Sequence, residues 1–184
     1  MIAPTITTER LVLTALDRAM FEQHVATVAD PRVSARVGTG QPQSRIEAWR
    51  RFCQAAGLWS LLGYGFRAIL DRASGAMIGI GGLAQFERGI AQLEGVPEVG
   101  YAINADWWGR GLTTEFLAAA LDWSDTVLDA PETRCIIAPN NMASVRVAEK
   151  NGFVPVDTVE NELGVSLVFR RLQAAKAIAL RSSA

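Results

Sequence analysis

Two glycines, Gly109 and Gly111, lie where an extended segment of the chain gives way to an amphipathic helix. Upstream, Glu98 to Ile103 has the residue types of a strand, and downstream apolar residues recur at helical spacing. The start of a helix leaves backbone N–H groups unpaired and carries the positive end of the helix dipole. Such a turn suits a phosphate or pyrophosphate, so it indicates a nucleotide-containing ligand.

The residues before this turn predict a front region and a meander of strands. Asp17 is a plausible helix N-cap, residues 38–42 have the Gly/Pro content of a loop, and residues 71–75 suit a hairpin turn. The expected elements are strands over 5–16, 64–70, 77–86 and 97–104 and helices over 17–29 and 44–56.

The residues after the turn predict two more helices and three more strands. Asn151 and Gly152 indicate a helix end of the left-handed type. The first helix is expected to bury one apolar face, made of Leu112, Phe116, Ala119, Trp123 and Val127. The other expected elements are strands over 134–138, 153–159 and 165–170, a helix over 141–150, and a short helix or flexible tail over 172–184.

Composition excludes several classes of function. The 184 residues fit one domain with its own core, over residues 1–184. Cys53 and Cys135 are far apart and His24 is the only histidine, so zinc spacing is absent and we expect no metal. A net charge of −1 and a pI near 5.9 argue against nucleic acid as a partner. The longest apolar stretches, such as 76–86, are too short to span a bilayer, so we expect a soluble cytoplasmic protein.

Four segments together resemble the GNAT superfamily of N-acetyltransferases, and specifically its branch that includes the ribosomal-protein N-terminal acetyltransferases. The last of the four is the most specific, because it fixes six identities as Asn-x-x-Ser-x-x-x-x-Glu-Lys-x-Gly-Phe. The resemblance covers nearly the whole chain. The segments are Thr8–Leu13, Met77–Leu83, the Trp-Trp-Gly-Arg-Gly turn led by Glu98–Tyr101, and Asn141–Phe153.

The resemblance implies a mixed α+β single domain, in which a mostly antiparallel, splayed sheet of about six to seven strands is flanked by helices. It also implies acetyl-CoA as co-substrate. Asp106 departs from the family, where many members have Gln or Arg, and a carboxylate there repels a pyrophosphate unless it points away or Arg110 compensates. The backbone amides implied to hold the pyrophosphate are those of Gly109, Arg110, Gly111, Leu112, Thr113 and Thr114.

Acetyl transfer to an amine also needs a polarised thioester carbonyl. The resemblance implies that the strand before the turn splays from the strand after it and opens a cleft for the thioester. We expect a backbone N–H at Ile103 or Asn104 to polarise the carbonyl, because a β-bulge there leaves amides unpaired.

Glu98 is the candidate general base, directly or through water, because it begins the strand expected to border the cleft. The alternative is a solvated carboxylate at a strand edge. An amine with a pKa of about 10.4 costs about 4 kcal/mol to neutralise at about pH 7.4, whereas an α-amino group near 8 costs under about 1. A strong base is therefore optional for N-terminal substrates.

Other polar and aromatic residues have two interpretations each. The resemblance implies that Asn141 contacts the cofactor arm, and a plain N-cap explains its identity equally well. Ser144 reaches the pantetheine or the thiol as a proton relay, or simply lies on the first helical turn. Tyr101 is a less favoured proton donor. Trp107 and Trp108 are expected to be core rather than a cover over the cleft, and His24 a packing or surface residue.

The leading hypothesis is an acetyl-CoA-dependent N-acetyltransferase in which the amine attacks directly in a ternary complex. The acceptor is a protein N-terminus or a small-molecule amine, and the sequence does not decide between them. The alternative from another class is a non-catalytic acyl-CoA-binding sensor. A hydrolase is disfavoured because the chain has no Gly-x-Ser-x-Gly elbow. A homodimer through the C-terminal strands is left open.

Overall fold

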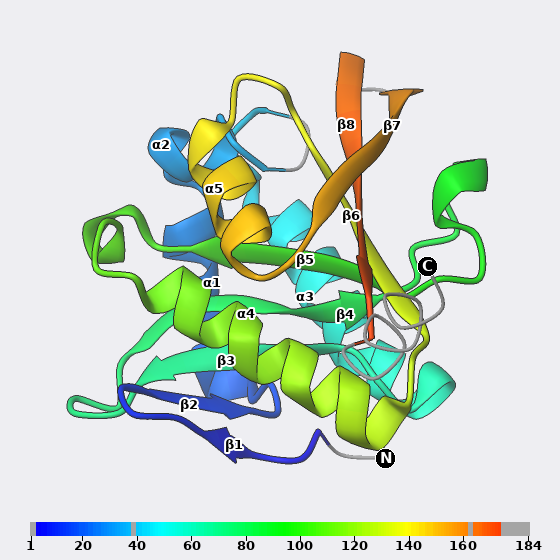
Figure 1. The fold of residues 1–184 in the computed structure, drawn as a ribbon. Coiled ribbons are helices and arrows are strands. Elements are labelled where there is room, and N and C mark those ends of the chain that lie inside the picture. The colour runs from blue at the N-terminus through cyan, green and yellow to red at the C-terminus, as the bar shows by residue number, and fades with distance from the viewer. Residues whose placement is uncertain (1–2, 38–39, 162–163, 174–184) are drawn as a thin grey trace.

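The sheet carries α4 and α5 on one face and α1 and α3 on the other (Figure 1). The computed structural model describes residues 3–37, 40–161 and 164–173. The described strands are β1 Ile6–Thr7, β2 Leu11–Thr14, β3 Phe66–Asp71, β4 Met77–Ala84, β5 Glu98–Ile103, β6 Glu132–Ile137, β7 Val154–Asn161 and β8 Gly164–Leu172. The described α-helices are α1 Phe21–Val28, α2 Pro31–Ser34, α3 Arg45–Leu62, α4 Leu112–Trp123 and α5 Met142–Lys150.

The strands follow the order β1-β2-β3-β4-β5-β6-β8-β7, and neighbours are antiparallel except at one place. There β5 and β6 run parallel and register a single pair, Glu98 with Arg134. The two strands therefore diverge beyond this pair. The mixed, mostly antiparallel and splayed sheet with flanking helices is confirmed. Eight strands are described rather than six or seven, because the expected strand over 5–16 folds back on itself as β1 and β2.

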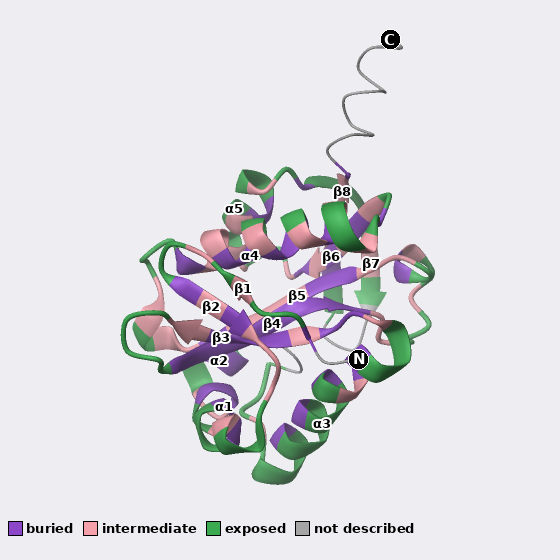
Figure 2. Ribbon diagram, turned by 90° about the horizontal axis from the view of Figure 1, so that it is seen from below, coloured by how far each residue is buried: buried purple, intermediate pink, exposed green. Residues whose placement is uncertain are grey.

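The main core lies between the sheet and the two helices α4 and α5, and burial follows the central strands (Figure 2). All eight residues of β4 are buried. Its glycines permit close approach: a Cβ on Gly81 would lie 2.6 Å from Cζ of Phe116 and 2.8 Å from Cβ of Tyr101. A side chain at Gly81 would push α4 off the sheet, so close packing explains the glycine at this position of the Met77–Leu83 segment.

The buried face of α4 differs from the expected one. Five residues are fully buried, and Val127 is 65% exposed. The helix ends in a wide turn of the π type, η4 Ser124–Leu128, which rotates the later residues away from the sheet. Sequence spacing assumed one regular helix, so the stripe was wrong at its C-terminal end. The buried residues of α4 are Leu112, Phe116, Leu117, Ala120 and Leu121.

Three other boundaries also differ from expectation. The helix over 44–56 continues to Leu62 and ends at Gly63, whose φ of 75° closes it. Asp17 does cap a helix, but that helix is the short η1 Arg18–Met20, ahead of α1. The tail begins later than residue 172, because Gln173 is buried and its Nε2 donates to the Asp125 carbonyl at 2.8 Å. Residues 174–184 lie outside the described residues.

No helix in the described part of the chain is both long and apolar enough to cross a bilayer.

The packing of His24 between α1 and α3 predicts an acid-sensitive fold. The side chain is 4% exposed against Phe21 and Phe52, and burial lowers the pKa of His24 to about 4. Unfolded chains bind the proton near pH 6.5, whereas the native state binds it only near pH 4. The free energy of unfolding is therefore expected to fall by up to about 3 kcal/mol as the pH drops from 6.5 to 4.

Urea unfolding of the wild type and of His24→Leu at pH 7, 5.5 and 4 measures this effect. The wild type should lose stability relative to the variant as the pH falls. Because His24 is the only histidine, its NMR titration is read without assignment, and a midpoint near 6.5 would contradict the prediction.

Candidate active site

The turn between β5 and α4 is built around two glycines in the left-handed region. Gly109 has φ 75° and Gly111, the N-cap of α4, has φ 76°. Ahead of them the short helix η3 Ala105–Trp107 reverses the chain, and Nε1 of Trp108 donates to the carbonyl of Ile103 at 2.9 Å. This bond fixes the indole beside the end of β5. The amides at the start of α4 are left without helical partners, as the sequence predicts for an anion site.

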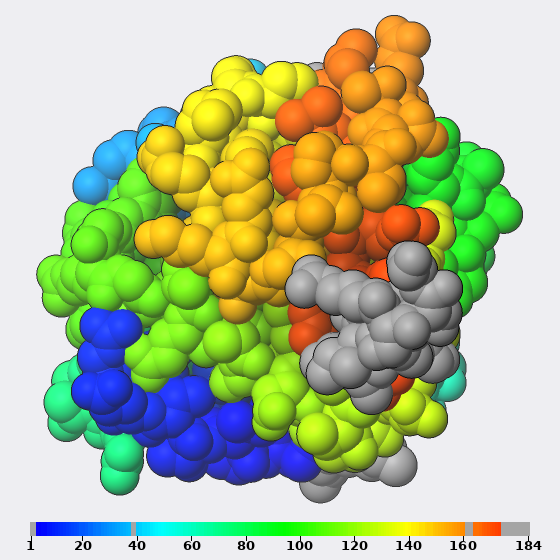
Figure 3. All heavy atoms as spheres, in the orientation of Figure 1, coloured from blue at the N-terminus to red at the C-terminus, as the bar shows by residue number. Residues whose placement is uncertain are grey.

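The N-terminal segment clamps this turn from outside through Glu115 of α4. The Glu115 carboxylate accepts from Thr8 Oγ1 at 2.6 Å, Arg10 N at 2.8 Å and Arg10 Nε at 2.7 Å. Nη1 of Arg10 also donates to the carbonyl of Arg110 within the turn, at 2.8 Å. On this face the N-terminal residues lie directly against α4 (Figure 3). The Thr8–Leu13 segment thus holds the glycine turn in place.

The pKa of Glu115 shows that the clamp binds an ionised carboxylate. Partial burial raises this pKa, but the hydrogen bonds from Thr8 and Arg10 outweigh burial and leave it below its usual value. The carboxylate is therefore charged at neutral pH, and both partners are held by a charge-assisted contact.

A cavity of about 400 Å³ opens between this turn and α5. Its walls come from three elements: the end of β5 with the glycine turn, the cavity-facing side of α5, and the segment around α2. The lining residues are Val33, Arg36, Val37, Tyr101, Ala102, Ile103, Trp108, Gly109, Gly111, Thr113, Thr114, Asn141, Ala143, Ser144, Arg146, Val147 and Lys150.

Seven of the nominated cofactor residues meet in this cavity, and three do not line it. The three are Asn104, Arg110 and Leu112. Leu112 is 5% exposed and packs in the core. The Arg110 guanidinium lies over the Trp107 ring, 4.8 Å from its centroid, and donates to the Asp106 carbonyl at 2.9 Å. Arg110 therefore does not offset Asp106 with its side chain.

Asp106 is neutralised from another direction. Its carboxylate pairs with Nη2 of Arg32 at 3.0 Å, and its side chain is 71% exposed. It does not line the cavity. The departure from the family pattern thus leaves no negative charge in the cavity, because Asp106 points away toward α2.

Asn104 is corrected as a donor to the thioester. Its N–H donates to the carbonyl of Ile78 at 2.8 Å, so it is already used. The register from Glu98 to Ile103 against β4 has no shift, so the expected bulge is not at this position. Because neighbouring residues in an antiparallel strand direct their N–H groups to opposite sides, the Ile103 amide faces away from β4, toward the gap beside β6.

Asn141 and Ser144 lie together at the start of α5. Oδ1 of Asn141 accepts from the Ser144 N–H at 3.3 Å, as an N-cap does, and its Nδ2 donates to the carbonyl of Arg36 at 3.3 Å. Across the cavity, Tyr101 packs edge-on against Phe116 with ring centroids 6.1 Å apart. Burial raises the pKa of Tyr101 to about 12, against a smaller opposing effect of a hydrogen bond with Ser144.

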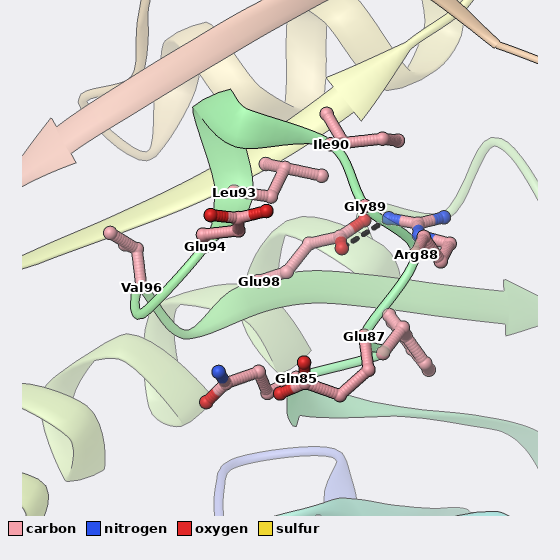
Figure 4. A pocket seen from close by; sticks show the side chains of 10 residues that line it. Gln85, Glu87, Arg88, Gly89, Ile90, Leu93, Glu94, Val96 and Glu98 are labelled. Carbon is pink, nitrogen blue, oxygen red and sulfur yellow. Dashed lines mark hydrogen bonds and ion pairs between the residues drawn. The ribbon is translucent and has the colours of Figure 1, made fainter.

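Glu98 lies apart from these residues, on the other side of the sheet. It is 6% exposed and pairs with Arg88 beneath the loop between β4 and β5 (Figure 4). That pocket has a volume of about 20 Å³, room for about one water. Glu98 and Ile103 stand five residues apart, about 16 Å along the strand. The carboxylate therefore does not touch a thioester held at Ile103. Burial raises the pKa of Glu98, and the Arg88 charge opposes this.

The sequence interpretation missed several lining residues. Arg146 and Lys150 follow Ser144 on α5, and helical spacing alone could have placed them on one side. Arg36 was not recoverable, because it reaches the cavity only through the tertiary placement of α2. Trp108 belongs to the cavity wall as well as to the core. His24 is a packing residue of the α1–α3 interface, as expected.

In the described part of the chain, no group of three or more His, Cys, Asp and Glu side chains is arranged to hold a metal ion.

Comparisons with known proteins agree with this geometry. A family model described as acetyltransferase (GNAT) domain matches residues 10–154. The structure is similar to that of a GNAT-family acetyltransferase from Bordetella pertussis, with 29% identity, a TM-score of 0.81, and coverage of 92% of this chain and 99% of that one. It also shares the fold of RimL, a ribosomal-protein α-N-acetyltransferase solved with coenzyme A, with 18% identity, a TM-score of 0.77, and coverage of 94% and 99%.

Among curated proteins, the uncharacterised YkkB of Bacillus subtilis is 32% identical over 82 residues, which are 45% of this chain and 46% of that protein. The match spans less than half the length of this curated relative. The family model, in contrast, includes Arg10 of the N-terminal clamp, the glycine turn and α5. The chain belongs to the GNAT family of acetyltransferases and is an acyltransferase.

Proposed function

We propose that this protein transfers an acetyl group from acetyl-CoA to the nitrogen of a primary amine. The observation that carries the proposal is the continuous path from the unpaired amides at the start of α4 to the Ile103 amide, along one cavity. Acetyl-CoA supplies an activated acetyl thioester at the end of a long arm with phosphates at its other end. The cavity has the α4 amides at one end, to bind the phosphates, and the Ile103 amide at the other, to polarise the thioester carbonyl.

The residues present fit coenzyme A by charge as well as by shape. Gly109 and Gly111 bring backbone N–H groups to the cavity without side chains, and Thr113 and Thr114 add donors on the first turn of α4. Arg110 and Leu112 take part through their amides alone. Arg146 and Lys150 add positive charge on α5. RimL, which shares the fold, was solved with coenzyme A, and this supports the assignment.

The acetyl carbonyl is polarised by the Ile103 N–H. A preorganised backbone donor aimed at the oxygen where negative charge develops stabilises the transition state. The neutral amine nitrogen forms its bond to the acetyl carbon and loses a proton to water, the carbon–sulfur bond breaks, and the sulfur takes a proton. We assign that proton to Ser144 Oγ, which lines the cavity beside Tyr101. Tyr101 keeps its own proton at neutral pH and is placed to resupply Ser144.

We retain Glu98 as the general base only through a chain of several waters that continues beyond its own pocket, because Glu98 lies about 16 Å along β5 from Ile103. Its pocket holds about one water and its carboxylate is engaged by Arg88, so it does not contact the amine in this arrangement. Such an indirect base is needed for amines of high pKa and not for α-amines, because neutralising the former near pH 7 costs several kcal/mol more.

The glycine turn is tested by Gly111→Val. A side chain at φ 76° is strained, and its Cβ would lie 3.6 Å from Nη2 of Arg10, so the turn that presents the amides should shift and the affinity for coenzyme A in calorimetry should fall at least about tenfold. Gly75→Val is the matched control, because Gly75 has φ 72° with open space around it in the β3–β4 turn. That variant should bind coenzyme A like the wild type. Equal affinity in both folded variants would remove the turn as the anion site.

The proton donors are tested by Ser144→Ala and Tyr101→Phe. Loss of a general acid should lower kcat by about a hundredfold and leave the KM for acetyl-CoA within about twofold. Tyr64→Phe is the control, since Tyr64 is the other tyrosine of the chain and bonds Gln85 away from the cavity. A Ser144→Ala enzyme with wild-type kcat would rule out Ser144, and full activity of Tyr101→Phe would reduce Tyr101 to packing.

The role of Glu98 is tested by the choice of acceptor. Glu98→Gln should lower kcat/KM by about tenfold or more for amines with a pKa near 10 and by less than about twofold for α-amines, as thiol release reports. Glu94→Gln, which alters another carboxylate of the same pocket, should change neither. An equal loss on both classes of amine would point to a structural role.

A further inference from the structure

The cavity is cationic. Among the described residues that line it, three carry positive charge, Arg36, Arg146 and Lys150, and none is a carboxylate. Arg146 and Lys150 lie one helical turn apart on α5 and face the phosphates of coenzyme A in the proposed function. Arg36 comes from a different wall, after α2, and needs its own explanation.

Arg36 lies at the thioester end of the cavity. Its guanidinium carbon is 4.5 Å from the centroid of the Trp108 ring, and that ring is fixed by the bond from its Nε1 to the Ile103 carbonyl, at 2.9 Å. The Arg36 carbonyl accepts from Nδ2 of Asn141 on the opposite wall, at 3.3 Å. Two contacts therefore hold Arg36 beside the residue whose amide polarises the acetyl group, where an acceptor must arrive.

The Arg36 charge is not neutralised within the described residues. The carboxylates near α2 are used by another arginine, since Asp30 and Asp106 both pair with Arg32, at 2.6 and 3.0 Å. No carboxylate of the described chain forms an ion pair with Arg36. A guanidinium with open donors binds a carboxylate in a two-pronged arrangement and repels an ammonium group.

A polycationic acceptor is therefore disfavoured. Each additional ammonium group would enter a cavity that has cations on two walls and no carboxylate to receive it. Glu98, the buried carboxylate on β5, is behind the sheet and already paired with Arg88. The same guanidinium favours the neutral form of a nearby amine, which is the form that attacks a thioester.

We propose that the acceptor is a primary amine carrying a carboxylate near its nitrogen, and that Arg36 binds this carboxylate. This inference rests on the proposed acetyl transfer and specifies its substrate class. A free amino acid and the N-terminus of a peptide beginning with Asp or Glu share this chemistry, and they form separate arms of the test.

The experiment measures thiol release and acceptor binding for the wild type, Arg36→Gln, Arg36→Lys and Arg50→Gln. Arg50 is the matched control because it is an exposed arginine on α3, outside the cavity. Amino acids are offered with a free carboxylate and as their carboxamides. Peptides are offered with Asp or with Asn at the N-terminus, and spermidine serves as the polycation. Calorimetry gives the affinity for coenzyme A and the affinity of each acceptor for the coenzyme-A-loaded protein.

The wild type should prefer the carboxylate over the carboxamide by at least about tenfold in kcat/KM and in affinity. Arg36→Gln should abolish this preference through KM, with kcat and the coenzyme A affinity within about twofold, and Arg36→Lys should retain part of it. Arg50→Gln should behave as the wild type.

Preference for spermidine or for carboxamides, or a carboxylate preference that survives Arg36→Gln, would overturn the inference. So would loss of coenzyme A affinity in Arg36→Gln with acceptor preference unchanged, because Arg36 would then belong to the donor site. If no amine releases thiol but carboxylate-bearing amines still bind through Arg36, the proposed acetyl transfer is refuted, whereas the proposed binding of such amines by Arg36 is supported. If carboxylate-bearing amines do not bind, the proposed role of Arg36 is refuted, whether or not other amines are acetylated.

Discussion

The divergence of β5 from β6 is the constraint on which the site depends. The two strands are neighbours in the sheet but pair only at Glu98 and Arg134, so beyond that point the backbone of β5 faces a gap. Helix α4 follows β5 and helix α5 follows β6, which brings the N-termini of both helices to the same gap. Parallel strands that separate at their carboxyl ends form a crevice where ligands bind in open sheets generally. Here the amides at the start of α4 and the Ile103 amide border the crevice.

Arginines remove negative charge from the surroundings of this crevice. Asp106 beside the glycine turn pairs with Arg32, and Glu115 on the first turn of α4 pairs with Arg10. Glu98 is held by Arg88 behind the sheet. Each ion pair at the surface adds little stability by itself. Their joint effect is electrostatic: the cavity keeps uncompensated positive charge, which suits an anionic donor and, in our proposal, an anionic group on the acceptor.

Much of the fold was predictable from local signals, and its exceptions have local causes. Turn and helix-end residues such as Ser74 and Gly152 marked element boundaries correctly, because their effect depends on a few neighbouring residues. The wide turn at the end of α4 was missed, since periodicity assumes a regular helix. The split of the first strand was also missed, because Thr8 and Arg10 turn the chain toward Glu115, a residue more than a hundred positions away.

The site was predictable where the chain itself carries the chemistry. The glycine turn was proposed from its own residues and Asn141 from the family resemblance, and the structure brings both, with Ser144, to one cavity. Asn104 failed as an amide donor because strand register decides which N–H faces the gap, and register is a tertiary property. The same limit applies to Arg36, which depends on the tertiary placement of α2, and to the separation of Glu98 from Ser144, which depends on the face of the sheet that Glu98 occupies.

The clamp between Arg10 and Glu115 has a thermodynamic consequence for the sheet edge. Because Arg10 also holds the Arg110 carbonyl, opening of the strands β1 and β2 is coupled to movement of the glycine turn. Energetic coupling between two regions acts equally in both directions. In our proposal, a coenzyme bound at the glycine turn thus slows fraying of β1 and β2, which lie about a hundred residues before α4 in the chain, and slower hydrogen–deuterium exchange in these strands reports its occupancy.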